Sequence, residues 1–181
     1  HSCHGGYDFA EDTRTCFEAN GSYSTPLLAK RAVDIIDKSE APLFLYLALQ
    51  NVHWPLEAPA QYLARFVNTT GGDTRRQAVA AMASIADEAI ANVTAALRRK
   101  GLWESSHLVL LADNGGPTNG NEGTQSNNYP MRGGKNTLWE GGTRVLLRAC
   151  LSRSVPRPSG SGGLPFLPPR GRQVGIPVEV N

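Results

Sequence analysis

The sequence predicts an α/β domain in which a mostly parallel sheet is flanked by helices. Three observations carry this prediction: an apolar run over residues 42–49, a second one over residues 107–112, and a long helical period between them. A strand that is buried on both faces reads as a continuous apolar run. Strand, helix and strand in this order are typical of a parallel crossover.

A first helix is expected to begin near Ser24 and to end near Lys38. Ser24 or Thr25 can cap its backbone amides, and Pro26 suits the first turn, where its nitrogen has no hydrogen to leave unpaired. Apolar residues recur on one face of this first helix, at Leu28, Ala32, Ile35 and Ile36. After the helix, the apolar run at residues 42–49 is expected to be a buried strand.

A second, longer helix is expected to begin at Asp73 or Thr74 and to end before Gly101. The basic residues 98–100 complement the negative end of the helix dipole, and a glycine suits the cap that follows. At ~1.5 Å per residue the helix would be roughly 40 Å long, enough to lie across a sheet. Its apolar residues recur at helical spacing, at Val79, Met82, Ala86, Ala89, Ile90, Val93 and Leu97.

The second apolar run leads directly into Asp113 and Asn114, which are candidates for binding a cation. In open α/β sheets, ligands bind just beyond the carboxyl ends of the strands. Side-chain oxygens at that point suit Ca²⁺ or Mg²⁺. An Asx-Gly sequence also opens turns routinely, so the pair by itself favours an ordinary turn.

Three further stretches carry a resemblance to a known family: PLFLYLALQNVHWPLEAP at 42–59, DEAIANVTAALRRKGLW at 87–103 and NNYPMRGGKNTLWEGGTR at 127–144. Together with Asp-Asn-Gly-Gly they resemble the type I sulfatases, and within them the arylsulfatase B group, over about residues 1–144. In that family Asp-Asn-Gly-Gly is followed by Pro-x-Arg-Gly-x-Lys and then by Leu-Trp-Glu-Gly-Gly. The resemblance implies the alkaline-phosphatase-like α/β fold, of which residues 1–144 would form a partial catalytic domain.

The same resemblance implies a site. Asp113 and Asn114 would be two of the calcium ligands, and His53 and Lys135 would contact the sulfate group. A divalent cation and a fixed ammonium suit a sulfate ester, because charge builds on its oxygens during hydrolysis. An imidazole can hydrogen-bond the sulfate and pass a proton. Without the matching stretches, His53 would be read as a loop histidine and Lys135 as a surface lysine.

By resemblance, the nucleophile is a formylglycine made from the cysteine of a Cys-x-Pro-x-Arg motif. None of Cys3, Cys16 and Cys150 begins that motif. The expectation is a fragment that lacks the N-terminal nucleophile region, carries about half of an active site and is inactive alone. The implied cofactors are Ca²⁺ and a formylglycine formed from a cysteine outside this chain.

The implied reaction is hydrolysis of a sulfate ester, on an aryl sulfate or a sulfated carbohydrate such as a glycosaminoglycan. Two alternatives stay open. A phosphatase or phosphodiesterase of the same fold would use a Ser or Thr nucleophile and more metal ligands, whereas the single Asp-Asn pair and the Arg-Gly-Gly-Lys stretch favour sulfate. A truncated paralogue without catalytic activity, which binds sulfated glycans or has no function, is the other alternative.

Three glycosylation acceptors indicate the secretory route, and thus a lysosomal or secreted glycoprotein. They are Asn20, Asn68 and Asn92, each followed at the second position by Ser or Thr. In that oxidising compartment, Cys3 and Cys16 are expected to form a disulfide.

Zinc is the rival interpretation of the N-terminal cysteines, because His1 and His4 lie beside Cys3 and would complete four ligands with Cys16. The irregular spacing of these four residues makes zinc the weaker alternative.

Composition indicates a globular chain and excludes several classes of protein. Of the 181 residues, 40% are hydrophobic and 19% charged, which does not suit a disordered chain. The formal net charge of +2 is too small to indicate a nucleic-acid partner. No apolar run approaches the ~20 residues that cross a bilayer. Residues 145–181 differ from the rest: they are rich in Pro, Gly and Arg, and are expected to be a divergent, disordered tail.

Overall fold

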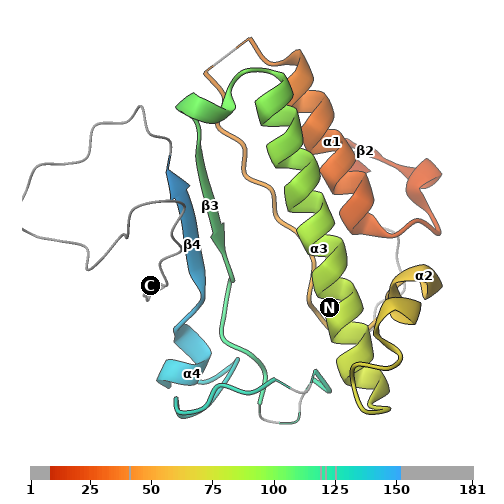
Figure 1. Ribbon diagram of the computed structural model, residues 1–181, viewed down its shortest axis with the longest axis vertical. Helices are drawn as coiled ribbons and strands as arrows, with labels where there is room; N and C mark the ends of the chain where they lie inside the picture. The colour runs from red at the N-terminus through yellow and green to blue at the C-terminus, as the bar shows by residue number, and fades with distance from the viewer. Residues whose placement is uncertain (1–8, 41, 119, 121, 125, 152–181) are drawn as a thin grey trace, which may run out of the picture.

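The computed structural model describes residues 9–40, 42–118, 120, 122–124 and 126–151 (Figure 1). The longer elements are α1 (Ser24–Lys38), α3 (Thr74–Arg99), β3 (His107–Leu111) and β4 (Leu147–Leu151). The shorter ones are β1 (Ala10–Glu11), β2 (Arg14–Thr15), α2 (Ala60–Leu63), α4 (Glu140–Thr143) and three 3-10 helices, η1 (Phe17–Ala19), η2 (Ala64–Phe66) and η3 (Trp103–Ser105).

Two helices, α1 and α3, pack side by side and enclose most of the core (Figure 1). Ala32 and Ile36 of α1 contact Val93, Ala96 and Leu97 of α3. Alanines at this contact let the two backbones approach closely, which buries the larger side chains between them. The two predicted helices are therefore confirmed, with boundaries within a residue of those expected.

The N-cap of α1 differs from the prediction. Tyr23 occupies the cap position and makes no side-chain capping bond. Thr25 is instead fully buried, and its hydroxyl donates to the Oδ1 atom of Asn51. The side chain of Thr25 thus binds α1 to the loop that contains Asn51.

The apolar stripe of α3 is shifted by part of a turn from the one predicted. Met82, Ala89, Val93 and Leu97 are buried as expected, whereas Val79, Ala86 and Ile90 are only half-buried. The remaining buried positions are taken by Ile85 and by the small residues Ala78, Ala81 and Ala96. Close helix packing favours these alanines, which a search for large apolar residues overlooks.

By length and composition alone, α3 would also suit a membrane span. Its buried stripe, however, packs against α1 and α2, as in the core helix of a globular domain. We therefore describe α3 as a core helix.

The cap of α3 gives a testable contribution to stability. The Asp73 carboxylate accepts hydrogen bonds from the backbone nitrogens of Arg75 and Arg76, at 2.9 and 3.1 Å. We expect Asp73→Ala to lower the free energy of unfolding by about 1 kcal/mol in urea denaturation. Asp87→Ala is the matched control, because Asp87 is exposed in the middle of the same helix. Equal midpoints for the two variants would show that the cap contributes nothing.

Residues 42–49 do not form the buried strand that was predicted. They run extended beside α3, but they belong to no sheet among the described residues (Figure 1). Leu45 and Leu47 pack against the α1–α3 cluster, whereas Phe44 and Tyr46 on the other side are 93% and 80% exposed. The helices therefore cover only one face of this segment.

The sheet that the structure describes beside α3 is antiparallel, not parallel. β3 pairs with β4 from His107 opposite Leu151 to Leu111 opposite Leu147. β3 is also not buried on both faces, since Val109 is 51% exposed. Residues 42–49 and β3 nevertheless run in the same direction, from the upper to the lower end of Figure 1.

β4 corrects the expected boundary of the tail. Residues 145–181 were expected to be disordered, yet Val145 is buried and residues 147–151 form a strand. Residues 145–151, VLLRACL, are mostly apolar, and this strand pairs with the apolar β3. Residues 152–181 lie outside the described residues.

Candidate active site

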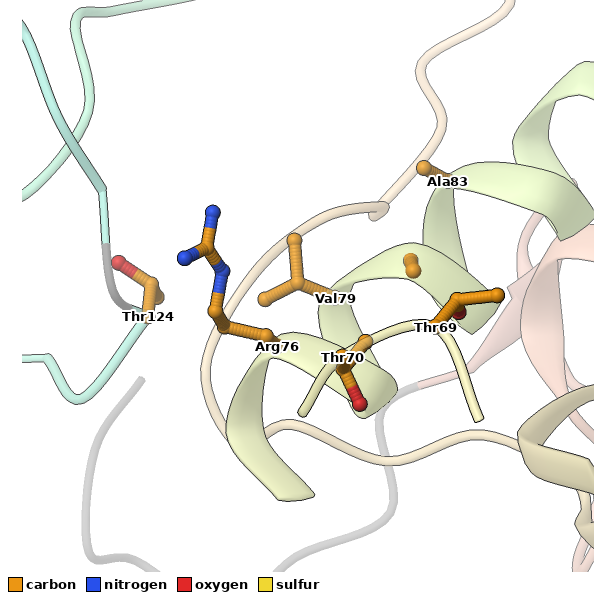
Figure 2. Close-up of a pocket in the computed structure, with 7 residues that line it drawn as sticks. Thr69, Thr70, Arg76, Val79, Ala83 and Thr124 are labelled. Carbon is orange, nitrogen blue, oxygen red and sulfur yellow. The ribbon is translucent and has the colours of Figure 1, made fainter. Parts of the chain in front are cut away.

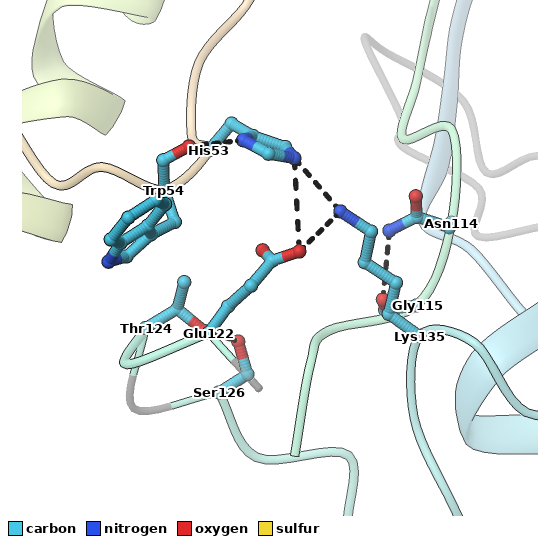
Figure 3. Close-up of polar contacts among 8 residues, drawn as sticks. All are labelled: His53, Trp54, Asn114, Gly115, Glu122, Thr124, Ser126 and Lys135. Carbon is cyan, nitrogen blue, oxygen red and sulfur yellow. Dashed lines mark hydrogen bonds and ion pairs between the residues drawn. The ribbon is translucent and has the colours of Figure 1, made fainter. Parts of the chain in front are cut away.

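The structure brings together His53 and Lys135, which are 82 residues apart in the chain (Figure 3). The Nζ atom of Lys135 lies 2.9 Å from the Nε2 atom of His53. Glu122 completes a triangle, with its Oε1 atom 2.7 Å from Lys135 Nζ and 3.9 Å from His53 Nε2. The side chains of Glu122 and Lys135 are only 17% and 19% exposed. Together these three side chains form a partly buried polar cluster.

The loop that carries His53 is fastened to the helices by Asn51. The Nδ2 atom of Asn51 donates to the carbonyl of Met82 in α3 at 2.6 Å, and its Oδ1 accepts from Thr25 in α1. The hydroxyl of Tyr23 donates to the carbonyl of Glu57, on the other side of His53. His53 is therefore held from both sides at the end of the extended segment.

The hydrogen bonds of His53 define its tautomer. Its Nδ1 atom lies 2.5 Å from the carbonyl oxygen of Trp54, which can only accept, so Nδ1 carries the hydrogen. Nε2 then accepts a hydrogen bond from the Lys135 ammonium. This arrangement describes a neutral imidazole whose Nε2 faces the two charged side chains.

Lys135 is placed by close approach of glycine backbones. Its backbone nitrogen donates to the carbonyl of Gly116 at 3.2 Å, just after the end of β3. One residue earlier, the nitrogen of Gly115 donates to the carbonyl of Gly142 at 2.9 Å. A Cβ atom added at Gly115 would lie 1.9 Å from the carbonyl oxygen of Gly141. The glycines therefore permit backbone contacts that no other residue would allow.

Asn128 holds these glycine segments together. Its Nδ2 atom donates to the carbonyls of Gly116, Gly133 and Gly141, at 2.8, 3.1 and 2.8 Å. Nothing in the sequence distinguishes Asn128, because an asparagine in a glycine-rich stretch looks the same as an ordinary turn residue.

Glu122 was also missed by the sequence analysis. It lies in an aperiodic loop, 13 residues before Lys135, and is not part of the stretches that carry the family resemblance. The hydrogen bond from Lys135 lowers the pKa of Glu122, and the charge of Lys135 lowers it further, against an opposing effect of burial. Glu122 is accordingly a carboxylate at neutral pH.

Asp113 and Asn114 lie at the end of β3, on the same backbone segment that contacts Lys135. Asp113 is exposed and Asn114 is half-buried. The Nδ2 atom of Asn114 donates to the carbonyl of Gly115 at 3.0 Å, which leaves Oδ1 as the atom that suits a cation (Figure 3). These are hard oxygen donors of the kind that calcium takes, six to eight at a time. Among the described residues, no group of three or more His, Cys, Asp or Glu side chains suits a metal. The role of Asp113 and Asn114 as calcium ligands therefore stays a prediction.

A cavity of about 540 Å³ lies beside the Glu122 loop, between that loop and the first turns of α3 (Figure 2). Thr124 lines it and is joined to the loop by a hydrogen bond from its backbone nitrogen to the carbonyl of Glu122, at 2.8 Å. His53 and Lys135 do not line this cavity. The other residues around it are Thr69, Thr70, Arg76, Val79, Ala80 and Ala83.

The three candidate glycosylation sites, Asn20, Asn68 and Asn92, are all exposed. Cys16 is half-buried. Cys3, together with His1 and His4, lies outside the described residues, so both the disulfide and the zinc alternative remain predictions.

Comparison with known proteins identifies the family. The family model described as Sulfatase matches residues 4–147. The chain is 42% identical to arylsulfatase J of Mus musculus over 145 residues, which cover 78% of this chain and 23% of that protein. It is 28% identical to N-acetylgalactosamine-6-sulfatase of Mus musculus over 123 residues, which cover 66% of this chain and 22% of that protein.

Solved structures agree with the sequence comparison. The crystal structure of Ps i-CgsB is similar, with a TM-score of 0.66 and 29% identity over 80% of this chain and 34% of that chain. The complex of Ps i-CgsB with k-i-k-neocarrahexaose gives a TM-score of 0.62 and 29% identity over 74% of this chain and 32% of that chain.

These matches confirm the alkaline-phosphatase-like fold as a partial domain, because the chain spans about a quarter of the length of the curated relatives. The narrower assignment to the arylsulfatase B group stays a prediction. The family model covers well over half of the chain, and it includes His53, Asp113, Asn114, Glu122 and Lys135. The chain therefore belongs to the sulfatase family.

Proposed function

We propose that this chain contributes the sulfate-binding part of the active site of a calcium-dependent sulfatase. The observation that carries the proposal is the contact between Lys135 and His53, 2.9 Å apart, in a member of the sulfatase family. His53 follows the extended segment 42–49, and the backbone of Lys135 is bound to Gly116 just after β3, which runs in the same direction. Ligands of α/β folds bind at such ends of the strands.

In this proposal Lys135 binds a sulfate oxygen and stabilises the charge that develops as the ester bond breaks. His53 presents Nε2 to the same place, where the imidazole, once Nε2 has taken up a proton, can give that proton to the oxygen of the alcohol that leaves. The hydrogen bond from Nδ1 to Trp54 holds the ring in the orientation that this role needs.

Two groups that the chain does not contain would complete the site. Asp113 and Asn114 would supply two oxygen ligands to Ca²⁺, which neutralises the sulfate oxygens when bound. A formylglycine from a Cys-x-Pro-x-Arg motif would supply the nucleophile, and that motif does not occur in the 181 residues.

We propose a sulfated carbohydrate, such as a glycosaminoglycan, as the natural substrate class. Two similar proteins support this class: an N-acetylgalactosamine-6-sulfatase by its name, and Ps i-CgsB by its complex with k-i-k-neocarrahexaose. An aryl sulfate serves as a simple probe of the same ester chemistry.

The function is tested by assaying two proteins on an aryl sulfate. The 181-residue chain alone should show no turnover above background, because it has no nucleophile motif. A longer product of the gene that carries Cys-x-Pro-x-Arg, made in cells that form formylglycine, should hydrolyse the ester in the presence of Ca²⁺. Turnover of aryl phosphate alone would favour the phosphatase alternative. Inactivity of the longer product on both esters would favour the paralogue without catalytic activity.

We propose that the protein follows the secretory route, to the lysosome or out of the cell, with glycans on Asn20, Asn68 and Asn92. In that compartment Cys3 and Cys16 should form a disulfide that closes a loop of ~14 residues, worth roughly 3 kcal/mol of unfolding free energy. Mass spectrometry of a non-reduced digest should find the two linked peptides. Free thiols at both positions in secreted protein would contradict the bridge.

A further inference from the structure

Glu122 places a negative charge beside the group that would bind the substrate's anion. Its Oε1 atom lies 2.7 Å from Lys135 Nζ. A sulfate oxygen that accepts a hydrogen bond from the same nitrogen would lie about 2.8 Å from it. The carboxylate oxygen and that sulfate oxygen are therefore at most about 5.5 Å apart, whatever the angle that they form at the lysine nitrogen.

The Glu122 carboxylate would repel an anion bound to Lys135. The carboxylate pairs with Lys135 at 2.7 Å, and His53 is neutral in the hydrogen-bonding arrangement above. The guanidinium of Arg75 faces Gly123, next along the loop, and no ion pair of Arg75 with Glu122 occurs among the described residues. With limited exposure to water, the carboxylate acts on a bound anion with little screening.

Repulsion between Glu122 and a ligand grows with the ligand's charge. A sulfate monoester carries one negative charge, whereas a phosphate monoester carries about 1.5 to 2 near neutral pH. At about 5.5 Å, an additional unit of charge changes the affinity by about tenfold for a dielectric between that of water and that of a protein surface. A positive cluster without the carboxylate would instead favour the more highly charged phosphate.

We propose that Glu122 is a specificity-determining residue, which makes the site prefer a singly charged sulfate ester to a doubly charged phosphate ester. This role rests on the proposed function, because it assumes that Lys135 binds the ester's anionic group. This role explains why a carboxylate lies beside Lys135, where it competes with the substrate's anionic group.

The test compares the binding of p-nitrophenyl sulfate and p-nitrophenyl phosphate to the full chain at neutral pH, by calorimetry. Glu122→Gln keeps the shape and a hydrogen-bond acceptor but removes the charge. We expect this variant to gain about tenfold more affinity for the phosphate ester than for the sulfate ester. Glu88→Gln is the matched control, because Glu88 is hydrogen-bonded to Arg65 at 2.7 Å in a different part of the molecule. It should change neither affinity.

Two other results have distinct meanings. Equal changes for both esters in Glu122→Gln, or weaker binding of both, would overturn the specificity role and leave the proposed sulfate site intact. Unchanged binding of p-nitrophenyl sulfate to Lys135→Ala would instead contradict the proposed site, and the specificity role with it.

Discussion

Replacement of Lys135 by alanine is expected to lower aryl sulfate hydrolysis by at least about 100-fold, in a product of the gene that carries the nucleophile motif. Removal of one well-placed donor to a developing oxyanion typically costs two to three orders of magnitude in rate. Lys135 is well placed because its backbone and its side chain are both fixed, by Gly116 and by the triangle with His53 and Glu122. The loss should appear mainly in kcat.

Lys100→Ala is the matched control for this experiment. Lys100 also makes one defined hydrogen bond through Nζ, to the carbonyl of Asp37 at 2.6 Å, but it lies at the far end of α3 from the site. Its replacement should leave the rate within about twofold, as is usual for surface changes. A Lys135→Ala enzyme with a similarly small loss would show that the lysine does not contact the reacting sulfate.

The meeting of His53 and Lys135 could be anticipated because it depends on chain direction. Residues 42–49 and β3 were predicted to run in parallel, and the loops after two parallel segments begin at the same end of the domain. That direction is present even though residues 42–49 form no ladder among the described residues (Figure 1). The helices were equally accessible to prediction, because their caps and apolar periods are local features.

The partners of Lys135 could not be anticipated in the same way. Glu122 and Asn128 contact it or its loop through segments without period, whose course is decided by backbone contacts among glycines. The exposure of β3 was also unpredictable, since an apolar run indicates that a strand can be buried but not which segments cover it. Local patterns thus predict the elements, while the loops that build the site depend on contacts distant in sequence.

The glycine contacts lead to the second large effect, which is expected for Gly115→Ala. The added Cβ atom would lie 1.9 Å from the carbonyl oxygen of Gly141 and 2.7 Å from its carbonyl carbon. Both are backbone atoms, so no side chain can move aside, and the segment that contains Gly141 must separate from the end of β3. We expect the free energy of unfolding to fall by about 3 kcal/mol, at the upper end for an added methyl group in a packed site.

The same substitution should also abolish ester binding, which distinguishes a local change of the site from a general loss of stability. Separation of the two segments breaks the bond from Gly115 to Gly142 and displaces Gly116, to which the backbone of Lys135 is bound. Gly123→Ala is the control: the atoms nearest to its Cβ would be those of the Arg75 guanidinium, at 3.4 Å or more, and that side chain can move. Urea unfolding and titration with p-nitrophenyl sulfate, applied to both variants, measure the two effects separately. If Gly115→Ala matches Gly123→Ala in both, the close backbone approach does not position Lys135, and the lysine must be held by its side-chain contacts alone.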